Sequence, residues 1–91
     1  MLQQKPTGAA ELGQFVSLGD VARGELRMQC QYASRYVDGS LPEEYPDVAS
    51  GAEFGKPLRL FGDPGNYHSY MIHQDDVDEF VRRVKQYRNG R

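Results

Sequence analysis

Residues 17–39 read SLGDVARGELRMQCQYASRYVDG, and this segment contains two short helical patterns in succession. The first pattern opens at Ser17, with Asp20 three residues further on. That spacing predicts a capping box, in which Val16 would act as the hydrophobic staple before the helix. Gly24 predicts an early end to this helix, because glycine is a poor helix former.

The second pattern predicts a helix over residues 28–38 that Gly39 ends. One side of this helix is expected to face the interior and carries Cys30, Ala33, Tyr36 and Val37. The polar residues Gln29, Gln31, Ser34 and Arg35 are expected on or near the other side. In this position Cys30 is expected to be a small buried hydrophobe and not a nucleophile.

The rest of the chain predicts a β-hairpin and a last helix. Residues 57–61 and 67–72 have strand-like composition and flank a cluster of turn residues over 62–66. The last helix begins near Gln74, has acids in its first turns and bases in its last, and carries an apolar stripe of Val77, Phe80, Val81, Val84 and Tyr87. Residues 43–53 show no period and are expected to be a loop. The predicted class is α+β, with a mobile arm over 1–12 and one domain over 13–91.

Composition excludes several classes. A chain of 91 residues with 38% hydrophobic and 26% charged residues suits one small globular domain. It has no apolar run long enough for a membrane helix, and its first residues lack the layout of a signal peptide, so we expect a cytoplasmic protein with no membrane partner. The single Cys30 excludes an internal disulfide and a cysteine-built zinc site.

The net charge of −2 hides two local basic stretches. From Arg27 to Val37 there are two arginines and no acid. Near the end of the chain, five bases follow one another without an acid: Arg82, Arg83, Lys85, Arg88 and Arg91. Stretches of this kind can meet a phosphate backbone, although solvation of a helix face and complementation of the helix dipole explain them equally well.

The motifs add a family resemblance. SLGDVA (residues 17–22) opens the first helix, GSLP (39–42) follows the second, and IHQDDVDEF (72–80) follows the hairpin. In these motifs and in the order of its patterns, the chain resembles the small excisionase and MerR-like winged-helix family over roughly residues 15–85. It departs from that family at Leu26, near the place of a turn glycine, and in a longer segment after Pro42.

The resemblance implies a small winged helix-turn-helix domain: two short helices, a β-hairpin wing and a C-terminal helix. It implies sequence-specific binding of double-stranded DNA without catalysis or cofactor, to assist site-specific recombination or control transcription in a phage or mobile element. The recognition helix would enter the major groove, with the wing beside the backbone or the minor groove. The implied DNA-contacting residues are Arg27, Gln29, Gln31, Ser34, Arg35, Lys56, Arg59 and His68. Further expected partners are a second copy of the chain, a recombinase or a host regulator.

Two alternatives remain open at this point. The acidic first half of the chain also suits a small protein-interaction module, such as an anti-repressor or a phage inhibitor of a host protein. The apolar stripe of the last helix could pack on its own domain or on a second copy. His68, His73, Asp75 and Asp76 lack metal-ligand spacing, and the two aspartates are expected to cap the last helix. We expect neither a metal site nor an enzyme.

Overall fold

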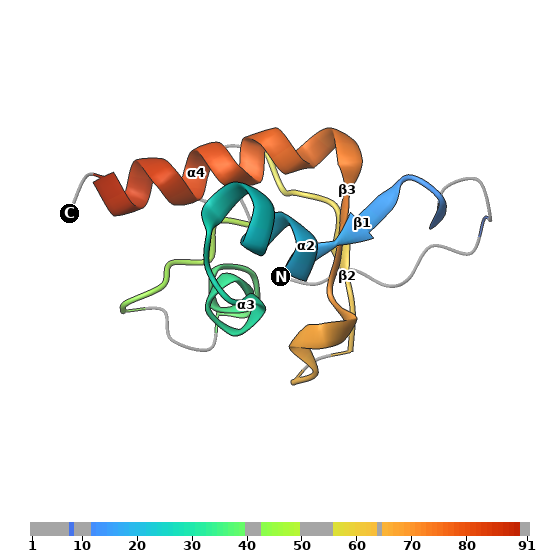
Figure 1. Ribbon diagram of the computed structural model, residues 1–91, viewed down its shortest axis with the longest axis horizontal. Helices are drawn as coiled ribbons and strands as arrows, with labels where there is room; N and C mark the ends of the chain where they lie inside the picture. Colours follow the sequence, from blue (N-terminus) through green and yellow to red (C-terminus); the bar gives the residue numbers. More distant parts are fainter. Residues whose placement is uncertain (1–7, 9–11, 40–42, 50–55, 64, 90–91) are drawn as a thin grey trace.

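The computed structural model describes residues 8, 12–39, 43–49, 56–63 and 65–89, which form a small α+β fold (Figure 1). Its elements are β1 (Phe15–Ser17), α2 (Leu18–Val21), α3 (Cys30–Asp38), β2 (Leu60–Phe61), β3 (Met71–His73) and α4 (Val77–Asn89). The predicted α+β class is confirmed. The arm expected over 1–12 lies outside the described residues except for Gly8 and Leu12. No helix in the described ranges is long and apolar enough to span a membrane.

The sheet has three antiparallel strands in the order β1-β3-β2. Ile72 of β3 lies opposite Val16 on one side and opposite Leu60 on the other. The predicted hairpin, β2–β3, is therefore confirmed, although part of its second run forms a 3-10 turn, Tyr67–Ser69, in place of a strand. Sequence reasoning assigns Val16 to a helix staple and misses β1, because three residues are too few to show an alternation.

The first helix is longer than the sequence predicts. Ser17 is its N-cap, but the serine side chain makes no capping hydrogen bond, so the predicted capping box is wrong. Asp20 instead accepts a hydrogen bond from the exposed Arg23, at 2.6 Å. The predicted end at Gly24 is also wrong, since a π-helical turn, Ala22–Leu26, continues α2.

α3 begins two residues later than predicted, with Gln29 as its N-cap. It ends at Gly39, as predicted, in the left-handed conformation with a φ of 68°. Glycine suits this position because it has no Cβ to clash. The four residues expected to face the interior, Cys30, Ala33, Tyr36 and Val37, are all buried.

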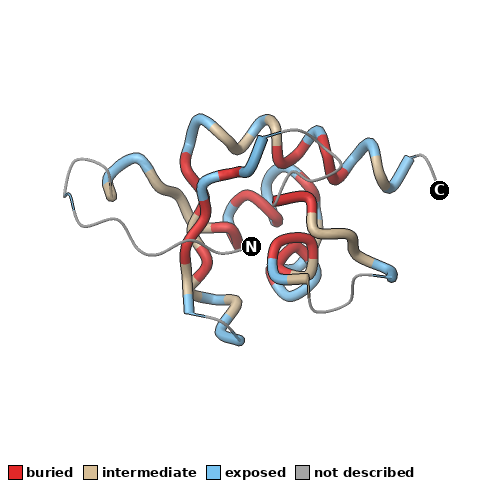
Figure 2. Tube along the Cα trace, turned by 180° about the vertical axis from the view of Figure 1, so that it is seen from behind, coloured by how far each residue is buried: buried red, intermediate tan, exposed pale blue. Residues whose placement is uncertain are grey.

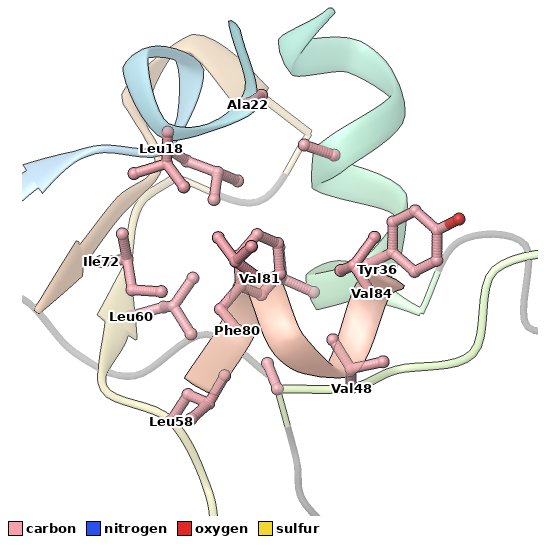
Figure 3. Close-up of a cluster of buried hydrophobic side chains, with 14 of the residues drawn as sticks. Leu18, Ala22, Tyr36, Val48, Leu58, Leu60, Ile72, Phe80, Val81 and Val84 are labelled. Atoms are coloured by element: carbon pink, nitrogen blue, oxygen red, sulfur yellow. The ribbon is translucent and has the colours of Figure 1, made fainter. Parts of the chain in front are cut away.

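The core lies between the sheet and the three helices (Figure 3). Phe80 and Val84 of α4 meet Ile72 of β3 and Leu60 of β2 in one buried cluster. Figure 2 shows buried segments on the inner side of α4 and exposed ones along its outer side. The predicted apolar stripe is confirmed and packs on its own domain. Burying one side chain of the size of Phe80 stabilises the fold by roughly 1.5–3 kcal/mol.

Arg83 is the largest fully buried side chain, with 2% of its surface exposed. Its guanidinium donates to the carbonyl oxygens of Val48 at 2.7 Å and Lys56 at 2.9 Å, and to the Glu79 carboxylate at 2.8 Å. Hydrogen bonds from Arg82 and Arg83 lower the pKa of Glu79 to about 2. Arg83 therefore links α4 to two segments without regular secondary structure, those that contain Val48 and Lys56.

A 3-10 turn, Gln74–Asp76, leads into α4, and its N-cap is His73. The Nδ1 atom of buried His73 accepts a hydrogen bond from the Asp75 amide at 3.1 Å, so Nε2 carries the proton and donates to Gln14 Oε1 at 2.8 Å. Asp76 binds Arg59 instead of capping the helix. The interpretation of both aspartates as caps is therefore wrong, because His73 is the N-cap and both aspartates lie within the 3-10 turn before α4.

Candidate nucleic-acid interface

α3 is held in place by α2 on one side and by the Tyr67–Ser69 turn of the hairpin on the other, which we call the wing turn (Figure 1). The Cys30 thiol at the start of α3 donates to the carbonyl oxygen of Tyr67 at 3.4 Å. Burial raises the pKa of this thiol, against the opposing effect of Arg23, so it remains a protonated donor. The expectation that Cys30 is buried is confirmed, and its contact joins α3 to the hairpin.

A groove of about 660 Å³ lies between the start of α3 and the wing turn. We call it the wing-turn groove. Its lining residues are Arg23, Arg27, Met28, Gln29, Cys30, Gln31, Tyr32, Tyr67 and His68. The described lining therefore combines two guanidinium groups, an imidazole and two carboxamides with apolar and aromatic side chains, and no acid is among these described residues. The groove brings together four of the sequence-predicted residues, namely Arg27, Gln29, Gln31 and His68.

Arg27 holds an unusual backbone conformation in this groove. Among the described residues other than glycine, Arg27 is the one with a positive φ, 53°. It ends the first helix in the left-handed region. A side chain at such a position costs free energy that glycine would avoid. Arg27 is exposed, and no described residue forms an ion pair with it. A strained, unpaired cation beside a groove is an arrangement often found where a residue is kept for binding.

Arg35 lies one helical turn after Gln31 on α3 and is half-buried. Its guanidinium carbon lies 5.0 Å from the ring centroid of Tyr32 and 5.4 Å from that of Tyr45. Both distances are within the range of cation–π attraction, which holds a guanidinium without neutralising its charge. Because Arg35 keeps its charge and a defined place, it can donate hydrogen bonds to an anion or a base edge.

A second hollow, about 360 Å³ in volume, shares Met28 and Tyr32 with the wing-turn groove. We call it the tyrosine cleft. It is lined by Met28, Tyr32, Tyr36, Tyr45 and Arg88. Sequence reasoning does not single out Tyr45, which lies in a segment without a period, and no local signal identifies it as part of a site.

Ser34 does not belong to this surface. It is 3% exposed, and its Oγ donates to the carbonyl oxygen of Gln31 at 2.7 Å. The expectation that Ser34 lies on the outer side of the helix is wrong, and with it the phosphate contact assigned to its hydroxyl. Ser34 lies four residues after Cys30 and three residues before Val37. Residues at these spacings share one side of a helix, so the sequence does indicate that Ser34 is on the buried side.

Lys56 and Arg59 lie elsewhere, in a hollow of about 430 Å³ that also contains Asp76 and Glu79 and, among the residues that the structure describes, shares no lining residue with the wing-turn groove. Arg59 donates to both carboxylate oxygens of Asp76, at 2.9 and 3.0 Å, and its backbone amide donates to the same group at 2.8 Å. These hydrogen bonds lower the pKa of Asp76. The structure thus separates these two predicted residues from the other polar residues of the predicted site.

The basic residues near the end of the chain have different surroundings in the structure. Arg82 pairs with Glu79 and Gln86 on the surface of α4, and Arg83 is buried in the contacts described above. The Arg83 guanidinium is therefore engaged inside the fold and not offered on the surface. Lys85 and Arg88 are exposed, and Arg88 lines the tyrosine cleft. Arg91 lies outside the described residues.

Comparisons with protein-family models, with curated proteins and with solved structures found no match to this chain. The groove and the cleft are the features of this surface that could bind a ligand. Together they present exposed cations, carboxamides and aromatic rings along α3, a combination suited to non-covalent binding of a polyanion.

Proposed function

We propose that this protein binds double-stranded DNA through α3 and the wing turn, as a small winged helix-turn-helix protein of the excisionase or repressor kind. The observation that carries this proposal is the wing-turn groove, whose described lining contains the cation Arg27, His68 and the Asp20-paired Arg23, but no acid. The order of elements supports it, since two consecutive helices, α2 and α3, precede the β2–β3 hairpin and α4. Without catalysis, such a protein would assist recombination or control transcription in a phage or mobile element.

The side chains of this surface suit separate tasks in DNA binding. Gln31 and Arg35 are one turn apart on α3, and their groups match the hydrogen-bonding edges of adenine and guanine in the major groove. Arg27 and His68 flank the groove from opposite sides and suit backbone phosphates. The net charge of −2 does not oppose this proposal, because phosphates respond to the local field of the surface they meet.

The size of the surface sets the expected mode of binding. α3 has nine residues, and a single module of this kind buries roughly 600–1,000 Å² on DNA. One copy therefore gives modest affinity. Tight binding would need two or more copies on neighbouring sites, which fits the cooperative arrays expected of an excisionase-like protein.

Fluorescence anisotropy with duplex DNA from the region flanking the gene tests the proposal, with an unrelated duplex of equal length as control. Between about 50 and 200 mM salt the affinity is expected to fall by orders of magnitude, because each phosphate contact releases counterions. Arg35→Ala should weaken binding to the native duplex at least about tenfold and leave the circular dichroism spectrum unchanged.

Arg82→Ala is the matched control, since it removes an arginine from the outer surface of α4, where it pairs with Glu79. This variant should bind like the parent protein. Absence of binding at 50 mM salt and micromolar protein would contradict the proposal. It would favour the alternative of a protein-interaction module, which the exposed ring of Tyr32, 41% accessible, would serve.

A further inference from the structure

One wall of the tyrosine cleft is formed by Tyr45, which belongs to residues 43–49, a segment to which neither the sequence nor the proposed function assigns a role. The ring of Tyr45 packs edge-on against buried Tyr36, with centroids 5.0 Å apart. Two hydrogen bonds fix the segment on either side of Tyr45: the Tyr87 hydroxyl donates to the Glu44 carbonyl oxygen at 3.0 Å, and the Val48 amide donates to the Tyr36 carbonyl oxygen at 2.9 Å. Tyr45 is therefore held against both α3 and α4.

This wall fixes the position of Arg35. The guanidinium carbon lies 5.4 Å from the Tyr45 ring centroid and 5.0 Å from that of Tyr32. Contact with two ring faces restrains a long side chain that would otherwise sample many rotamers, while the N–H groups at the edge of the guanidinium stay available for hydrogen bonds. A restrained donor loses less entropy on binding than a free one.

Arg88, at the end of α4, is the cation among the described residues that line the cleft. It is exposed, and among the described residues it has no ion-pair partner, in contrast to Arg82 one and a half turns earlier. The acids of residues 43–49, namely Glu43, Glu44 and Asp47, are not among the described residues that line the cleft. An anion entering it would thus meet Arg88 and three tyrosine rings, and the Arg35 guanidinium lies over two of those rings.

We infer that the tyrosine cleft is a second part of the DNA-binding surface, in which Tyr45 positions the Arg35 guanidinium and Arg88 contacts a backbone phosphate beside it. The inference rests on the proposed function and extends it. It brings residues 43–49 and the end of α4 into the interface, so that α3 is flanked by contacts from the wing turn on one side and from Arg88 on the other.

Arg88→Ala tests the phosphate contact, with the native and unrelated duplexes titrated across a range of salt concentrations. Removing one phosphate contact should lower the slope of log affinity against log salt by about 0.9 and weaken binding to both duplexes alike. Arg82→Ala, from the same helix, should leave the slope unchanged. If the Arg88→Ala slope equals that of the parent, the cleft holds no phosphate.

Tyr45 is tested by a double-mutant cycle with Arg35. Tyr45→Leu keeps apolar bulk but removes the ring face, so it should lower the preference for the native duplex about two- to fivefold, whereas Tyr45→Phe should retain it. In the Arg35→Ala background, Tyr45→Leu should have no further effect on that preference. An equal effect in both backgrounds would show that Tyr45 acts on the fold alone.

The outcomes separate this inference from the proposed function. Salt-dependent binding by the parent protein, combined with unchanged behaviour of the Arg88 and Tyr45 variants, would overturn only the inference. A parent protein that binds neither duplex would overturn the inference and the proposed function together. A smaller salt slope for Arg88→Ala, together with a weaker preference of Tyr45→Leu for the native duplex, would support both the inference and the proposed function.

Discussion

The arginines of α4 and those around α3 differ in what surrounds them, although the sequence presents both as basic stretches without acids. Glu79, one turn earlier on α4, binds Arg82 and Arg83, and backbone carbonyl oxygens take the other donors of Arg83. Around α3, Arg35 lies over tyrosine rings and Arg27 is exposed beside a groove without acids. A basic stretch in a sequence can offer its charges to an anion only where the fold brings no acceptor to them.

The largest expected effect comes from Arg83→Met, which would remove the buried guanidinium. It leaves the carbonyl oxygens of Val48 and Lys56 without their donor inside the fold, at a cost of about 3 kcal/mol in the free energy of unfolding. Urea denaturation followed by circular dichroism measures this loss.

The folded fraction of Arg83→Met should still bind DNA, since Arg83 contacts no residue of the wing-turn groove. Arg82→Ala serves as the control and should leave the urea midpoint nearly unchanged, because exposed pairs contribute little. A small change for Arg83→Met would show that the two arginines of α4 do not differ as the structure indicates.

Arg27→Gly should separate stability from binding. Glycine adopts the left-handed conformation at position 27 without strain, so the free energy of unfolding should rise by about 0.5–1 kcal/mol. The same change removes a cation from the groove and should lower the salt slope of DNA binding by about 0.9.

Arg27→Ala provides the comparison, because it removes the charge but keeps the strain. It should bind DNA as weakly as Arg27→Gly without gaining stability. If Arg27→Gly binds DNA with the salt slope of the parent, Arg27 does not contact a phosphate.

A smaller effect concerns pH. The pKa of Glu79 is about 2 in the folded protein against an ordinary value of 4.5, because Arg82 and Arg83 hydrogen-bond to its ionised form. A carboxyl group whose pKa is lowered by folding stabilises the folded state at pH values above its unfolded-state pKa. This contribution is lost as the pH falls from about 4.5 towards 2. Since the Glu79 side chain is one-third exposed, solvent reduces the effect.

Glu79→Gln should therefore have a lower urea midpoint than the parent protein at neutral pH. Near pH 3 the difference between the two urea midpoints should be smaller. Its DNA binding at neutral pH should match that of the parent, because Glu79 lies on α4, away from the wing-turn groove. Parallel pH profiles for the two proteins would contradict the assigned role of this carboxylate.

The sequence is most informative where one element repeats a pattern over several turns. The stripe of α4 repeats over 13 residues and predicts both the helix and its buried side, and Gly39 predicts the end of α3 because few other residues adopt its conformation. β1 escapes prediction because its three residues depend on pairing with β3, a partner distant in sequence.

The burial of charged and polar groups is harder to predict. Arg83 follows Phe80 by three residues and so shares its side of the helix, but a charged residue there is buried only if acceptors meet it. Those acceptors are carbonyl oxygens of Val48 and Lys56, which no local pattern brings close. Tyr45 is missed for the same reason, because no local pattern predicts that it lies beside Arg35. Gln31 and Arg35, in contrast, are predicted as site residues from the sequence.

The most direct test of the DNA-binding proposal is an amide chemical-shift titration of the labelled protein with the native duplex at about 50 mM salt. The account predicts that the largest shifts occur over residues 27–32 and at His68, on the two walls of the wing-turn groove, while Arg82 and Lys85 on α4 stay unchanged. Shifts concentrated on the outer surface of α4, or no shifts at micromolar concentrations, would contradict it.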